Sequence, residues 1–188
     1  MRVEIDRFCN KWLNKVDQIE GDDVEEFLDR FFSLYVVFNR LYIQASYELS
    51  QREEMNLENR ESFPDRQAAT NYIVQFYGAK RFLNSLNSNA DTKEAILDLI
   101  GILDNELFNI NIHPITGKPL GESDKELLDD LVNNNPNRKA KAILKFLYAI
   151  RCNIFHARKG ADPIQVIVLQ PTVTLLRKII EMVRNDLD

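Results

Sequence analysis

Residues 29–47 read DRFFSLYVVFNRLYIQASY, and this stretch decides the fold. Its apolar side chains cover most faces of a helix, which is typical of a helix in the middle of a bundle. The stretch belongs to a longer predicted helix over residues 24–52. Asp23 precedes this helix and Glu26 follows three residues later, which is the capping-box pattern of a helix start.

Outward from this helix, the chain reads as further helices separated by short turns. They are predicted over residues 3–16, 65–86, 92–108, 138–158 and 164–187, and a short one opens at Ser123 with Glu126 in capping-box position. Pro171 should kink or restart the last helix, where QVIVLQ (165–170) leaves a strand as the alternative. No strand alternation stands out elsewhere. The sequence therefore predicts an all-α, up-and-down helical bundle with extra short helices, in one domain over residues 1–188.

The composition excludes several classes of protein. A net charge of −5 argues against a chain that coats nucleic acid or membrane with its whole surface. The two cysteines lie too far apart in the chain for a disulfide framework, and with two histidines they make no zinc pattern. The N-terminus lacks the apolar stretch of a secretory signal, and no run of about 18 apolar residues indicates a transmembrane helix. We expect a cytoplasmic protein with no metal, no cofactor and no membrane partner.

The helix predicted over residues 138–158 carries three stripes of side chains. An apolar stripe should face the core: Ile143, Phe146, Leu147, Ile150 and Ile154. A basic and polar stripe lies opposite: Arg138, Lys141, Lys145 and His156. A third stripe is too apolar for an open surface: Leu144, Tyr148, Arg151 and Phe155. The third stripe is a candidate packing surface for a partner chain.

The same segment concentrates positive charge. Seven basic residues and no acidic one lie within residues 138–159. A basic helix with Tyr148 and Phe155 interleaved suits a phosphate backbone. The alternative is a solvated face that balances acidic neighbours within the bundle, and charge alone favours this alternative.

RCNIFHARKG (151–160) places an arginine five residues before a histidine, a spacing that by itself is only a hypothesis of catalysis. The segment resembles the signature of the HEPN domain family, in which an arginine precedes a histidine by four to six residues near the end of a late helix. A common form of this signature is Arg-Asn-Asn-x-Phe-His-Gly, and four residues here match its positions: Arg151, Asn153, Phe155 and His156. SLYVVFNRLY (33–42) is similar to an aromatic-rich "FNALY" stretch in one branch of the family. The likeness covers both segments and the helical layout.

The resemblance implies a HEPN-type bundle and a metal-independent endoribonuclease with a toxin or phage-defence role. Histidine titrates near neutrality and can move protons, and a guanidinium can stabilise a phosphate transition state. Arg151, His156 and Asn153 are the implied catalytic residues. The candidate RNA-binding residues are Lys141, Lys145, Arg158 and Lys159.

The implied partners are RNA, with tRNA as one candidate, and a protein antitoxin. An obligate homodimer is also implied, with Leu144, Tyr148 and Phe155 at the seam. The alternative is a catalytically silent helical dimer that binds RNA, nucleotide or a protein. Cys152, where the family usually has a polar residue, favours this alternative, while the set of Arg151, Asn153 and His156 favours the nuclease.

Overall fold

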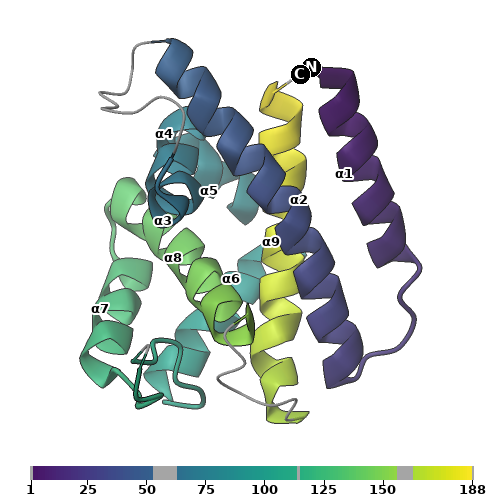
Figure 1. The fold of residues 1–188 in the computed structure, drawn as a ribbon. Helices are drawn as coiled ribbons and strands as arrows, with labels where there is room; N and C mark the ends of the chain where they lie inside the picture. Colours follow the sequence, from purple (N-terminus) through teal and green to yellow (C-terminus); the bar gives the residue numbers. More distant parts are fainter. Residues whose placement is uncertain (1, 53–62, 114, 156–162, 188) are drawn as a thin grey trace.

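The computed structural model describes residues 2–52, 63–113, 115–155 and 163–187. Within these ranges the chain forms helices joined by turns, and one isolated antiparallel bridge joins Ile112 to Pro119. The predicted all-α bundle is confirmed (Figure 1). In the same ranges, no helix combines the length and the apolar character needed to cross a bilayer.

Helix α2 (Val24–Gln51) forms the middle of the bundle. It packs along α9 (Val166–Leu187) and against α1 (Arg2–Asp17) (Figure 1). Half of its 28 residues are buried. The Asp23 side chain caps its start, because Oδ1 accepts hydrogen bonds from the backbone of Glu25 and Glu26 at 2.8 and 3.1 Å. The predicted position and start of this helix are therefore confirmed.

The helix predicted over residues 65–86 is interrupted. The chain forms α3 (Asp65–Gln67), a π-helical turn (Ala68–Tyr72), α4 (Ile73–Tyr77) and α5 (Ala79–Asn87). Gly78 separates the last two with a φ of 86°, a conformation that side chains with a Cβ rarely adopt. The prediction of one continuous helix was therefore wrong, because the positive φ of Gly78 ends α4.

Two other predicted helices have different boundaries in the structure. Helix α6 (Ala90–Asp104) begins after an Asn89 cap and ends four residues earlier than predicted. Helix α7 (Gly121–Val132) begins before Ser123, so Ser123 is not its cap.

Helix α9 follows a 3₁₀ turn at Pro163–Gln165 and continues through Pro171 without a break. The strand alternative and the restart at Pro171 are therefore wrong. Packing against α2 and α6 along its length outweighs the local cost of the proline. The Thr172 hydroxyl also donates to the Val168 and Leu169 carbonyls of the same turn.

Helix α8 (Pro136–Phe155) lies between α7 and the segment from the π-helical turn to α5 (Figure 1). Its predicted core stripe is confirmed for four residues that are at most 3% exposed: Ile143, Phe146, Leu147 and Ile150. Ile154 packs partly buried against the same core. The side chain of Leu144 is 1% exposed, so the core-facing surface of α8 is wider than predicted.

Candidate functional site

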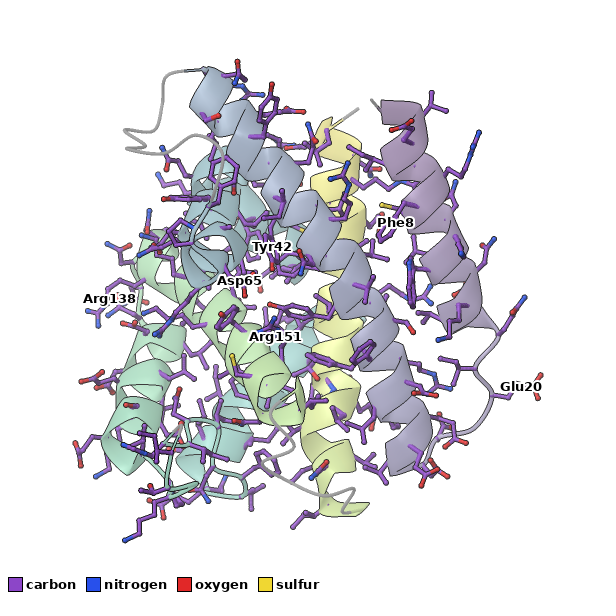
Figure 2. The ribbon with its side chains drawn as sticks, in the orientation of Figure 1. Phe8, Glu20, Tyr42, Asp65, Arg138 and Arg151 are labelled. Carbon is purple, nitrogen blue, oxygen red and sulfur yellow. The ribbon has the colours of Figure 1, made fainter. Side chains whose placement is uncertain are left out.

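Arg151 lies in the last turn of α8 and contacts the first residue of α3. Its Nη2 atom is 3.7 Å from Oδ2 of Asp65, and its side chain is 22% exposed. The guanidinium carbon is 5.8 Å from the ring centre of Tyr35 and 5.7 Å from that of Tyr148. Figure 2 shows Arg151, Asp65 and Tyr42 grouped where α2, α3 and α8 meet. The arginine is thus held in place, yet part of it still reaches solvent.

Asp65 is the centre of this group. Its Oδ2 accepts a hydrogen bond from the Tyr148 hydroxyl at 3.0 Å, and its Oδ1 accepts one from the Tyr42 hydroxyl. Tyr42 and Tyr35 are buried in the core, whereas the Asp65 side chain is 41% exposed. We call these five residues (Tyr35, Tyr42, Asp65, Tyr148 and Arg151) the Asp65 cluster. It connects the bundle core to the surface.

The tyrosines of the Asp65 cluster are neutral hydrogen-bond donors at ordinary pH. Burial, followed by the charge of Asp65, raises the pKa of Tyr148 to about 12. Burial also raises the pKa of Tyr42 and of Tyr35, and for Tyr42 the hydrogen bond to Asp65 adds to the effect. Burial acts to lower the pKa of Arg151, but the Cys152 sulfur and the Asp65 charge outweigh it and leave that pKa raised. The cluster therefore carries a permanent cation beside a carboxylate.

The predicted partner of Arg151 falls beyond the last described residue of α8. His156, Arg158 and Lys159 all lie outside the described residues. The side chain of Phe155 lies outside them too.

Asn153 has a different environment from Arg151. Its side chain is 5% exposed, and its amide nitrogen donates to the Ile110 carbonyl at 2.8 Å. Two residues apart on a helix, Asn153 and Arg151 point in roughly opposite directions. The structure therefore does not bring these two predicted catalytic side chains together, and it gives Asn153 a structural bond to the segment before α7.

The predicted basic stripe of α8 is partly neutralised by α7. Lys145 Nζ lies 3.3 Å from Oδ2 of Asp130, and Arg138 Nε donates to Oδ1 at 2.7 Å. Burial acts to raise the pKa of Asp130, but these hydrogen bonds and charges outweigh it and lower that pKa. For Arg138 and Lys145 the structure favours a solvated face balanced within the bundle. Lys141 is half-buried on the same helix.

The predicted dimer stripe needs one correction. Leu144 is buried in the core of its own chain, so its side chain cannot form a seam with a partner. Tyr148 is half-buried and belongs to the Asp65 cluster.

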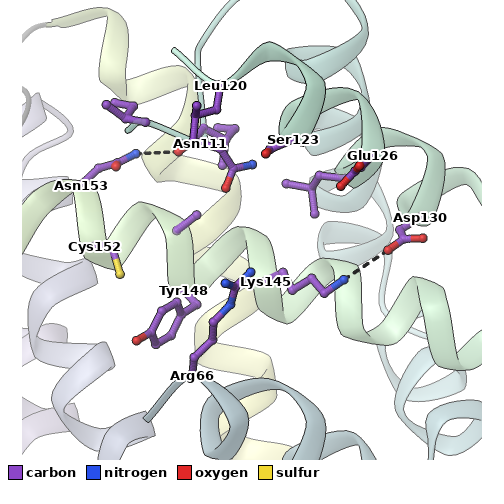
Figure 3. A pocket seen from close by; sticks show the side chains of 14 residues that line it. Arg66, Asn111, Leu120, Ser123, Glu126, Asp130, Lys145, Tyr148, Cys152 and Asn153 are labelled. Atoms are coloured by element: carbon purple, nitrogen blue, oxygen red, sulfur yellow. Dashed lines mark hydrogen bonds and ion pairs between the residues drawn. The ribbon is translucent and has the colours of Figure 1, made fainter. Parts of the chain in front are cut away.

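A cavity of about 340 Å³ lies directly beside the Asp65 cluster. Tyr148 belongs to both, since it lines the cavity and bonds Asp65. Figure 3 shows Arg66 reaching over α8 from one side, with Asn111, Ser123 and Glu126 across from it. Asp124 of α7 fixes the opposite wall, because its carboxylate accepts hydrogen bonds from the backbone of Ile110 and Asn111.

Sequence reasoning missed Asp65 and Arg66. Both follow Pro64, a position that reads as an ordinary helix start. Asp65 and Tyr148 are 83 positions apart, and no local pattern links them.

Among the residues that the structure describes, no three His, Cys, Asp or Glu side chains are grouped to hold a metal ion. Comparisons of the chain with protein-family models, with curated proteins and with solved structures find no match.

Proposed function

We propose that the protein is a metal-independent endoribonuclease of HEPN type, in which Arg151 and His156 act on an RNA phosphate. The observation that carries the proposal is the environment of Arg151. The guanidinium of Arg151 lies against Asp65 and near two tyrosine rings, and its side chain is still 22% exposed. It lies five residues before the histidine of the motif. A preorganised cation of this kind suits the charge that develops on a phosphate.

In the proposed reaction, the 2′-hydroxyl of one nucleotide attacks the adjacent phosphorus. His156 takes the hydroxyl proton, and the bond from phosphorus to the 5′-oxygen breaks. The departing oxygen receives a proton, from the imidazolium or from water. Arg151 stabilises the negative charge on the phosphate oxygens. The products are a 2′,3′-cyclic phosphate and a 5′-hydroxyl end.

A homodimer would solve a geometric difficulty. Five residues on an ideal helix separate two side chains by about 140° and about 7.5 Å along the axis. Two copies that place both motifs in one cleft would let one phosphate meet both groups. Tyr148 and Phe155 remain the proposed seam residues, without Leu144. Light scattering that finds a monomer at the concentrations where RNA is cleaved would exclude this arrangement.

The second candidate is a catalytically silent helical protein that binds RNA, nucleotide or a protein partner. Two observations favour it. Asp65 already contacts Arg151, and Cys152 stands where the family usually has a polar residue.

The biological role under the first candidate is growth inhibition or phage defence, with an antitoxin as a protein partner.

The test is cleavage of total RNA and tRNA by purified protein in excess EDTA, beside His156→Ala. We expect cleavage to survive EDTA and to fall at least about 100-fold in the variant, since acid–base catalysis contributes that much. The new ends should be 2′,3′-cyclic phosphate and 5′-hydroxyl. If wild type and variant leave RNA equally intact, the silent binding protein becomes the better account.

A further inference from the structure

The cavity beside the Asp65 cluster has the size of a ligand site. Its volume of about 340 Å³ lies at the lower end of the roughly 300 to 1,000 Å³ of small-molecule sites. Tyr148 and Cys152 of α8 line one part of it, and Arg66 of α3 lies beside them (Figure 3). Asn111 and residues of α7 line the opposite side. Walls from separate parts of the chain therefore converge on one space.

Two of the four charged groups in the lining are already paired. Lys145 and Asp130 lie 3.3 Å apart, and Asp130 also bonds Arg138. Within the described part of the chain, neither Arg66 nor Glu126 forms an ion pair. These two charges lie on opposite sides of the cavity (Figure 3). They match a ligand that carries an anion at one end and N–H donors at the other.

Tyr148 relates this space to the proposed catalytic residues. It lines the cavity, its hydroxyl donates to Asp65, and its ring centre is 5.7 Å from the guanidinium carbon of Arg151. One side chain therefore separates the cavity from Arg151. Aromatic side chains are common platforms for nucleic-acid bases. A nucleotide in the cavity would be a direct neighbour of a phosphate at Arg151.

We propose that the cavity binds one guanosine nucleotide of the RNA strand, next to the phosphate that is cleaved. Arg66 binds the nucleotide's phosphate, and Glu126 accepts hydrogen bonds from the base. A carboxylate can only accept hydrogen bonds, and guanine presents two adjacent N–H donors on its pairing edge. The inference rests on the proposed function for its RNA substrate, but it concerns binding and does not require cleavage.

The test measures binding to His156→Ala protein, which should not cleave. Two short RNAs that differ only in guanosine or uridine at one position are titrated by fluorescence anisotropy. We expect about tenfold tighter binding of the guanosine RNA, and Glu126→Gln should remove most of that preference. Arg66→Ala should weaken the binding of both RNAs by the same factor, because a phosphate contact does not distinguish one base from another.

Matched controls come from exposed residues outside the cavity lining. Asp129→Asn on α7 removes a carboxylate from the helix that carries Glu126, and Lys80→Ala on α5 removes an exposed cation. Both should bind the two RNAs as the parent does. Circular dichroism melts of all variants identify any that fail to fold.

Two outcomes would overturn the inference. One is equal affinity of the parent for the two RNAs; the other is unchanged binding by both Arg66→Ala and Glu126→Gln. Free guanosine monophosphate forms a separate arm of the titration. If it binds as tightly as the RNA, with the same dependence on Arg66 and Glu126, the ligand is a free nucleotide and the RNA assignment falls. A failure of the nuclease proposal is a different result: the wild type would then bind RNA without cleaving it.

Discussion

The two ends of α8 hold their basic side chains in different ways. In its first half, Arg138 and Lys145 are 55% and 38% exposed and share the Asp130 carboxylate. In the last turn, Arg151 is 22% exposed, lies within about 6 Å of the centres of two tyrosine rings and contacts Asp65. In the first arrangement, a carboxylate that is 17% exposed pairs with two more exposed cations across two helices. The second is a fixed cation at the edge of the core.

The difference shows that burial and fixed partners, more than positive charge, distinguish the candidate functional end of α8. Ion pairs of exposed cations contribute only about 0 to 1 kcal/mol, because water screens the cation, and Arg138 and Lys145 are such cations. A half-buried guanidinium needs its partners, since an uncompensated buried charge is strongly destabilising. Two tyrosine hydroxyls bind Asp65, and Asp65 in turn contacts Arg151.

The largest loss of stability should come from Asp65→Ala, and Asp130→Ala is the matched variant for comparison. Asp65→Ala should lower the free energy of unfolding by about 2 kcal/mol, because the buried Tyr42 hydroxyl and Arg151 lose their acceptor. Asp130→Ala should lower it by no more than about 1 kcal/mol, because its partners are exposed. Urea denaturation followed by circular dichroism measures both. Equal losses of unfolding free energy in the two variants would contradict the distinction between the two parts of α8.

Tyr148→Phe should have an intermediate effect that depends on pH. The pKa of Tyr148 is raised to about 12 in the folded protein, so folding favours its neutral form. That contribution is present below the unfolded pKa near 10 and is lost as the pH rises toward 12. The wild type should therefore lose more stability than Tyr148→Phe between these pH values. Tyrosinate absorbance of the folded protein should also show one fewer late-titrating tyrosine in the variant.

The smallest effects should come from Arg138→Ala and Lys145→Ala. Each should change the free energy of unfolding by less than about 1 kcal/mol, and added salt should shrink the difference further. The wild type should also lose some stability in acid, as Asp130 is protonated through its lowered pKa. Chemical denaturation at low and high salt tests this. A salt-insensitive loss larger than that of Asp65→Ala would reverse the comparison.

Much of the fold followed from local patterns. The start of α2 was predicted because Asp23 is a side-chain cap, and α8 because its apolar residues recur at helical spacing. The break at Gly78 was missed because a lone glycine in a helical pattern carries no local signal of the φ of 86° that it adopts here. The true start of α7 was missed because Ser123 and Glu126 imitate a cap inside the helix.

The candidate site was only half predictable. Arg151 belongs to a local motif, so the sequence identified it. Asp65 could not be identified, because its contact with Arg151 exists only after α3 packs beside α8. The same holds for Arg66 at the cavity, and for the burial of Leu144, which depends on how many neighbours α8 has.

The most direct test of the central claim compares RNA cleavage in excess EDTA by wild type, Arg151→Ala and Arg138→Ala. Both variants remove one arginine from the same helix, so the overall charge changes equally. We predict that Arg138→Ala cleaves at a rate comparable to wild type, and that Arg151→Ala cleaves at least about 100-fold more slowly, the usual cost of losing a transition-state donor. Equal rates in all three proteins, or equal losses in the two variants, would contradict the assignment of Arg151 to the reaction.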